Sequence, residues 1–130
     1  MIHKTTNKHF DLFVNESSFW LSRLGLRDYE VRFVHMESED NGSRAWVEAD
    51  SENRQATFGL EVNWLCEQPT DYNISKSAFH ECCELLLHNV HEHLRNMYAI
   101  HKTNELVHSI IRTLENLVFE EYWHTKRKKK

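Results

Sequence analysis

The spacing of apolar residues predicts an amphipathic helix near the start of the chain. Apolar side chains recur every three or four positions between Phe10 and Leu24, which places them on one face of a helix. Gly25 follows directly, and glycine commonly ends a helix because it adopts a left-handed conformation without strain. We therefore expect a helix over residues 10–24, and we expect the polar residues 1–9 to lack regular structure.

The pattern then changes to the alternation that is typical of half-buried strands. Apolar residues take every second position in three short runs: residues 29–33, 45–49 and 56–62. Turn-forming residues occupy positions 40–43 and 50–53, and the Asn41-Gly42 pair favours a tight hairpin. Three strands joined by tight turns predict a three-stranded antiparallel β-meander, which needs a helix layer on one face for stability.

Helical spacing returns after a short loop. One pattern without Gly or Pro runs over residues 74–97, and Ser75 or Ser77 is its candidate N-cap. The polar residues 101–104 separate it from a last helix, whose apolar positions run from Leu106 to Val118. The predicted fold class is α+β, with an N-terminal helix, the three-stranded antiparallel meander and two C-terminal helices.

Length and charge define the organisation of the chain. Its 130 residues suit a single domain with one hydrophobic core. Five of the 16 basic residues occupy positions 126–130, so residues 1–125 hold 11 basic against 20 acidic residues, a net charge of −9. We interpret residues 1–125 as one acidic domain and residues 126–130 as a solvated basic tail. Contact with nucleic acid is left to this tail and is expected to be weak, because phosphate binding needs clustered Lys and Arg.

Neither a membrane span nor a secretory signal is indicated. No segment reaches the roughly 20 apolar residues of a transmembrane helix, and the first ten residues lack the apolar core of a signal peptide. The three cysteines are an odd number, and Cys82 and Cys83 are adjacent, which is unlike a disulfide framework. These features predict a protein of a reducing cytoplasm, without a membrane partner.

The segment with the clearest chemistry lies in the helix predicted over residues 74–97. His80 and Glu84 are four positions apart, so on a helix they project from one face and can bind the same metal ion. Helices with the sequence HExxH hold zinc in this way, although here Glu84 stands in place of the second histidine. Glu81 is placed to accept a proton from metal-bound water. The spacing indicates His80 and Glu84 as metal ligands and Glu81 as the general base.

A third ligand has three candidates. His108 and Glu105 lie at the start of the last predicted helix, and His101 lies in the connection before it. The apolar stripe of that helix, taken to begin at Leu106, directs His108 and Glu105 away from the core, which argues against both. Zinc is the expected cofactor, although this donor set also suits other divalent ions. The alternative interpretation of the spacing is that His80 and Glu84 are an ordinary solvent-facing pair on a helix.

Several segments occur in an order that resembles one family. They are LGLRDYEV from Leu24, AWV from Ala45, RQAT from Arg54, LEVNW from Leu60, AFHE from Ala78 and HSIIRTLEN from His108. This order resembles a family of small metallopeptidases encoded by phages and prophages. The resemblance implies a minimal zincin-like fold, with His80 as the first zinc ligand and Glu81 as the general base. It places Glu84 where the second histidine is expected and makes His108 the third ligand.

The resemblance implies a zinc-dependent hydrolase, in particular a peptidase, that acts on a peptide or protein in the cytoplasm of the host cell. The departure at Glu84 supports a second hypothesis. A chain that kept the fold and lost the chemistry would be a protein-binding module for a host or phage partner.

Overall fold

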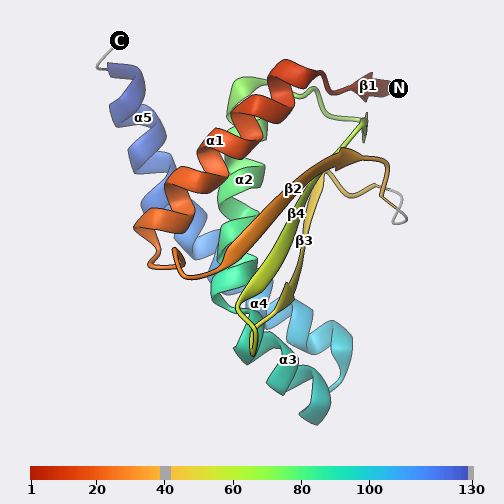
Figure 1. The fold of residues 1–130 in the computed structure, drawn as a ribbon, viewed down its shortest axis with the longest axis vertical. Helices are drawn as coiled ribbons and strands as arrows, with labels where there is room; N and C mark the ends of the chain where they lie inside the picture. The colour runs from red at the N-terminus through yellow and green to blue at the C-terminus, as the bar shows by residue number, and fades with distance from the viewer. Residues whose placement is uncertain (39–41, 129–130) are drawn as a thin grey trace.

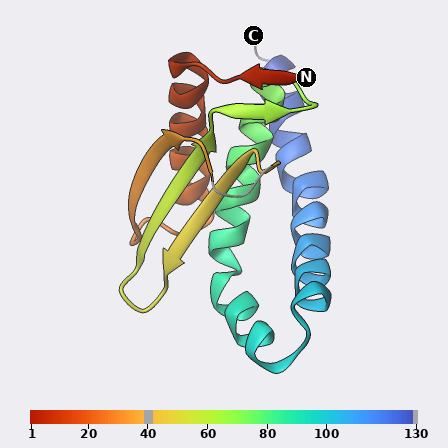
Figure 2. The same ribbon diagram turned by 90° about the vertical axis from the view of Figure 1, so that its right-hand side faces the viewer.

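The computed structural model describes residues 1–38 and 42–128. Helices and strands are mixed along the chain, and both termini lie at the same end of the molecule (Figures 1 and 2). The elements are β1 (Ile2–Lys4), α1 (Asn7–Arg23), β2 (Glu30–Met36), β3 (Ala45–Asp50), β4 (Gln55–Glu61), β5 (Asn63–Leu65), α2 (Asp71–Leu86), α3 (His88–Met97), α4 (Ile100–Leu114), a π-helical segment (Glu115–Phe119) and α5 (Glu120–Lys128). The predicted α+β class is therefore confirmed, while the topology differs in several places.

Helix α1 confirms the helix predicted over residues 10–24 and begins earlier than expected. Thr6 is its N-cap: the Thr6 side chain accepts a hydrogen bond from the backbone N–H of His9 at 3.3 Å, and the backbone N–H of Thr6 donates to His9 Nδ1 at 2.9 Å. Gly25 follows the helix with a φ of 76°, as expected of a terminating glycine. The prediction that residues 1–9 lack regular structure is wrong, because β1 pairs antiparallel with β5.

The sheet is not the predicted antiparallel meander. Its strand order is β2-β4-β3, with β2 parallel to β4 and β3 antiparallel to β4. Strand β2 ends at Met36, and β3 begins at Ala45 on the opposite edge of the sheet; Asp40 and Asn41 of the predicted turn lie outside the described residues. Strand β4 is the most buried of the three, with Ala56, Phe58 and Leu60 inside. The most buried strand is therefore the central one, and both its edges are paired.

Close packing across the sheet makes Gly59 a sensitive position. Trp46 of β3 lies opposite Gly59 of β4, and a Cβ atom at position 59 would lie 2.1 Å from two ring carbons of the indole. We expect Gly59→Ala to lower the free energy of unfolding by about 1–3 kcal/mol, because the indole must leave its position. Urea unfolding measures the change, with Thr57→Ala on the same strand as the control. A loss below about 0.5 kcal/mol would contradict this packing.

The single helix predicted over residues 74–97 is two helices. Helix α2 ends at Leu86, Leu87 forms the break, and α3 begins at His88. The predicted N-caps are also wrong, because Thr70 caps α2 while Ser75 and Ser77 are buried inside the helix. No residue of α3 is buried. The apolar spacing that continues from α2 into α3 therefore does not mean that the two helices share one buried face.

The next connection is displaced as well. Residues 101–104 were predicted to separate two helices, but they form the first turn of α4, and the break lies at Tyr98 and Ala99. After Leu114 the chain continues through the π-helical segment into α5, which gives one long rod of helix (Figure 2). Lys126, placed in the solvated tail by the sequence, lies in α5, and its Nζ is 3.0 Å from Oε1 of the buried Glu16.

The core lies between the three-stranded sheet and the helices. Helix α2 packs against α1 on one side and contacts β3, α4 and the π-helical segment on the others. In Figure 2 it stands between the sheet and the rod of α4 and α5. Large aromatic side chains fill this interior, among them Phe13, Phe58, Trp64, Phe79 and Phe119. Among the helices described, none has the length and apolar character needed to cross a bilayer.

Candidate metal centre

Three side chains predicted as metal ligands lie together on two neighbouring helices. His80 and Glu84 project from one face of α2, and His108 comes from α4. One donor atom from each lies within 4.8 Å of the other two, and the two imidazole rings are 5.6 Å apart between centroids. The predicted alternatives His101 and Glu105 are exposed on α4 and do not belong to this group.

The spacing of the three donors fits a tetrahedral ion. Glu84 Oε1 lies 3.5 Å from His80 Nε2 and 3.1 Å from His108 Nε2. Ligand atoms that are each about 2.1 Å from a tetrahedral zinc ion are about 3.4 Å apart. The two separations from Glu84 Oε1 lie on either side of that value, and the two histidine nitrogens lie within 4.8 Å of each other, so side-chain shifts would bring all three atoms onto one ion.

The central carboxylate oxygen has no hydrogen bond within the described part of the chain. Glu84 Oε1 is buried, and the two histidine nitrogens approach it at ion-pair distance without hydrogen-bond geometry. Buried polar atoms almost always have a partner, and an exception needs an explanation. A bound cation at this point would satisfy the oxygen. The residues present therefore fit a divalent metal, with one fourth position left for water or substrate.

Glu115 contacts the ring nitrogen of His80 that does not face Glu84. Its Oε2 lies 3.2 Å from His80 Nδ1, so the ring donates from Nδ1 and turns Nε2 toward Glu84. A carboxylate on the second ring nitrogen is the usual support of a histidine ligand. Glu115 is the first residue of the π-helical segment, a local distortion that is frequent at functional sites. Sequence reasoning missed this residue, although it lies seven positions after His108 and thus on the same helix face.

His91 contacts the other oxygen of the central carboxylate. Its Nδ1 lies 4.0 Å from Glu84 Oε2, and its Nε2 lies 2.8 Å from Asn104 Oδ1. Asn104 thereby fixes the ring from α4. Glu84 is thus approached by three histidines, and its orientation is held from α2, α3 and α4.

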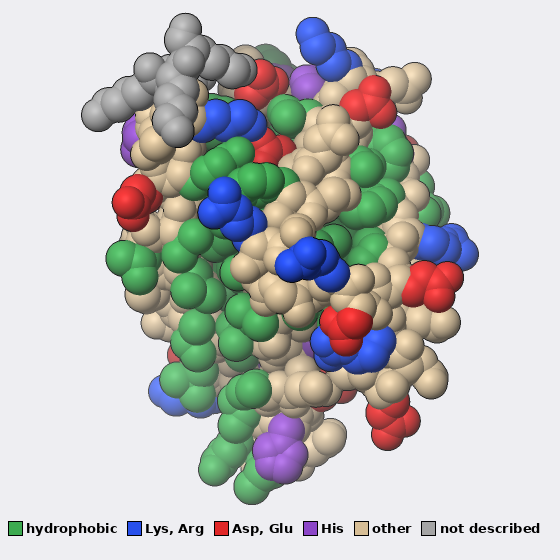
Figure 3. Space-filling view, turned by 60° about the vertical axis from the view of Figure 1, so that its left-hand side comes forward, with side chains coloured by type: hydrophobic (Ala, Val, Ile, Leu, Met, Phe, Trp, Pro, Cys, Tyr) green, Lys and Arg blue, Asp and Glu red, His purple; other side chains and the backbone are tan. Residues whose placement is uncertain are grey.

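The position of His108 depends on which face of α4 is buried. The sequence suggested a stripe beginning at Leu106, but the buried residues are Thr103, Val107 and Ile111. Leu106 is 51% exposed. It is one of several exposed large hydrophobic side chains, and Figure 3 shows side chains of this kind gathered in a column on one face of the molecule. With this face of α4 buried, His108 lies on the side of the helix that faces α2. The argument from the sequence against His108 as a ligand therefore no longer holds.

Charges in the centre stabilise one another. Burial lowers the pKa of His80, but the hydrogen bond to Glu115 and the close carboxylate of Glu84 outweigh burial and raise it to about 10. Burial raises the pKa of Glu84, but the close contact with His80 and the nearby charge of His108 outweigh burial and lower it. Without a metal the centre is therefore a cluster of ion pairs around Glu84.

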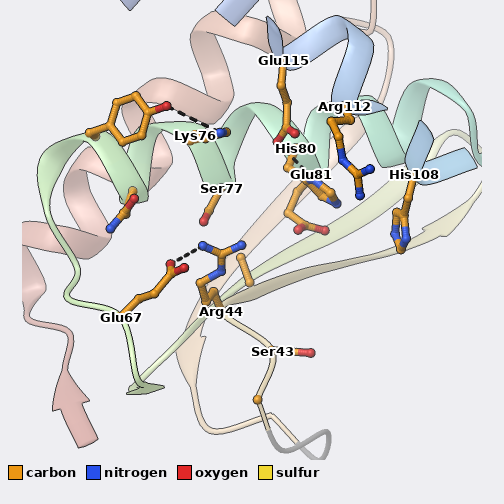
Figure 4. A pocket seen from close by; sticks show the side chains of 14 residues that line it. Ser43, Arg44, Glu67, Lys76, Ser77, His80, Glu81, His108, Arg112 and Glu115 are labelled. Carbon is orange, nitrogen blue, oxygen red and sulfur yellow. Dashed lines mark hydrogen bonds and ion pairs between the residues drawn. The ribbon is translucent and has the colours of Figure 1, made fainter. Parts of the chain in front are cut away.

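Glu81 is placed beside this cluster, at the wall of a pocket of about 530 Å³. Its side chain points into the pocket near His80 (Figure 4). Burial raises the pKa of Glu81 to about 8, against the opposing charge of His80. This value is close to neutral pH, where a carboxyl group can both accept and return a proton.

The neighbouring cysteines have no role of this kind. Cys82 and Cys83 are fully buried, and burial raises the pKa of the Cys83 thiol to about 12. Both therefore pack as small apolar side chains.

Comparison of the chain with protein-family models, with curated proteins and with solved structures finds no match.

Proposed function

We propose that the protein is a zinc-dependent hydrolase, and specifically a peptidase, of phage or prophage origin that acts in the cytoplasm of the host cell. The observation that carries the proposal is the convergence of His80, Glu84 and His108 on one point, with the buried Glu84 Oε1 at its centre. The phage origin and the cytoplasmic location rest on the sequence resemblance and on the cysteine pattern alone.

Each residue has a distinct task in this proposal. His80, Glu84 and His108 would hold the ion, and Glu115 would fix the ring of His80. A bound zinc ion supplies Lewis acidity, which polarises a carbonyl group and makes nearby water more acidic. Glu81 accepts the proton of the attacking water and returns it to the leaving amine, because its carboxyl lies in the pocket next to His80.

The shape of the pocket supports an extended peptide as the substrate. Its wall follows α2 from Tyr72 to Glu81, nine residues and therefore about 14 Å along the helix. The opposite wall is formed by residues 42–45. An extended chain advances about 3.4 Å per residue, so about four residues of a peptide fit along this length.

The test combines metal content with hydrolysis. We expect tag-free protein to contain about one zinc per chain by mass spectrometry, and to cleave unfolded, fluorescently labelled casein until a chelator is added. His93→Ala, which removes an exposed histidine of α3, serves as the control for zinc bound at the surface and should retain both properties. Folded protein that takes up no zinc would overturn the proposal.

A second function is favoured by the ion pairs within the cluster. Because the protonated His80 already neutralises Glu84, the fold needs no metal to tolerate this buried carboxylate. We infer as the alternative a protein-binding module for a host or phage partner, with the same fold and no hydrolysis. Metal-free, folded and inactive protein would favour it, and a Glu84→His variant that still captured the same partner would support it further.

A further inference from the structure

The pocket contains one cationic side chain whose charge is not paired within the described residues. Arg44 pairs with Glu67, and Lys76 pairs with Glu120 at 3.8 Å. Arg112 also lines the pocket, and in the described part of the chain it has neither an ion pair nor a side-chain hydrogen bond. Figure 4 shows its guanidinium directed into the pocket between His80 and His108.

Arg112 lies close to the metal centre along α4. It follows His108 by four residues, so the two lie about one helical turn, or 6 Å, apart on the same face. Glu115, which supports His80, is less than one turn further along the helix rod. A group held by Arg112 therefore lies about one to two peptide residues away from the donor atoms of the centre.

We propose that Arg112 binds a carboxylate of the peptide substrate, carried by a residue next to the bond that is cut. The inference rests on the proposed function, because it assigns a substrate class to that site. A guanidinium presents two parallel N–H donors that match the two oxygens of a carboxylate. The carboxylate is either the C-terminus of the peptide or an Asp or Glu side chain, and both have the same recognition chemistry.

The charges around Arg112 favour a singly charged group. Glu67 and Glu115 also line the pocket and would repel a strongly anionic ligand. One carboxylate neutralises Arg112 and adds no excess negative charge to the pocket. A neutral peptide, by contrast, would leave the guanidinium unpaired when it covers the pocket, which costs affinity.

The test uses two pairs of acetylated tetrapeptides. One pair ends in alanine with either a free carboxylate or an amide, and the other ends in glutamate or glutamine, both amidated. NMR titration gives the dissociation constants for the protein as purified and after chelation. We expect the carboxylate member of at least one pair to bind about tenfold more tightly than its partner, and Arg112→Gln to abolish that ratio.

Two further variants make the result specific. Arg112→Lys keeps the charge and loses the paired donors, so it should retain only part of the preference. Lys102→Gln removes an exposed cation of α4 outside the pocket and should retain the full ratio. The pair that shows the preference identifies the source of the carboxylate, and either pair supports the inference.

The inference is overturned by equal binding within both pairs, by no binding at millimolar peptide, or by a preference that survives in Arg112→Gln. These outcomes test the role of Arg112 and do not depend on whether the proposed hydrolase function is correct. Zinc-containing protein without the preference overturns the role of Arg112 alone. Protein that takes up no zinc overturns the hydrolase, while the chelated sample still decides whether Arg112 selects carboxylates.

Discussion

Glu81→Gln is expected to lower the rate of casein hydrolysis by about 10²–10⁴-fold while zinc stays bound. Glutamine keeps the size of the side chain and cannot take a proton from water, so the variant removes the base and leaves the three donor residues in place. Initial rates with zinc-loaded protein, together with metal content by mass spectrometry, give both quantities on the same sample.

We expect Glu81→Gln to leave the fold intact, because burial already favours the neutral form of the Glu81 carboxyl. The pKa of Glu81 is raised to about 8, so its carboxyl is mostly protonated at pH 7 in the metal-free chain, and a neutral amide replaces a mostly neutral acid. Glu105→Gln, on the exposed side of α4, is the matched control and should hydrolyse casein at the wild-type rate. Glu81→Gln with undiminished hydrolysis would show that another group accepts the proton.

The part of the site carried by α2 could be predicted because local geometry determines it. Residues four apart on any helix share a face, so His80 and Glu84 had to lie side by side once the segment was helical. That inference did not depend on the helix ends, and it survived the errors at Thr70 and Leu87. The role of the pair as metal ligands remains a prediction.

The relation of His108 to α2 could not be settled from spacing. Helix α4 carries two overlapping apolar stripes, one through Leu106 and Ile110 and one through Val107 and Ile111. Hydrophobicity alone does not distinguish them, and only the packing of the whole fold buries the second and exposes the first. His108 and Glu115 face the pocket as a consequence of that choice.

The order of the strands in the sheet could not be predicted from the sequence pattern either. Alternation reports that a segment is extended and half-buried, and it says nothing about which strands are neighbours. A tight turn at residues 40–43 would have placed β2 beside β3, whereas the chain crosses over and β4 fills the centre. Residues 58–61 of β4 are all buried, as expected of a central strand, but their sequence Phe-Gly-Leu-Glu is not the continuous apolar run that would have indicated this position.

His80→Ala is expected to abolish stoichiometric zinc binding. Only Glu84 and His108 of the three donors would remain, and two ligands from a partly exposed site do not hold zinc against water. Mass spectrometry of the purified variant gives its metal content, and circular dichroism confirms that it is folded. His93→Ala is the control, since it removes one imidazole from the exposed surface of α3. A His80→Ala protein that still carried about one zinc per chain would place the ion elsewhere among the remaining histidines.

The pH dependence of zinc binding by the wild-type chain gives a second, independent measure of the same centre. Because Glu115 and Glu84 raise the pKa of His80 to about 10, its ring is protonated at pH 7 and zinc must displace that proton. Zinc affinity should therefore rise as the pH increases from 6 to 8, with about one proton released from His80 for each ion bound. Titration against a competing chelator in lightly buffered solution records both. His80→Ala should show neither signal, whereas an ion held elsewhere would leave the proton on His80 in place.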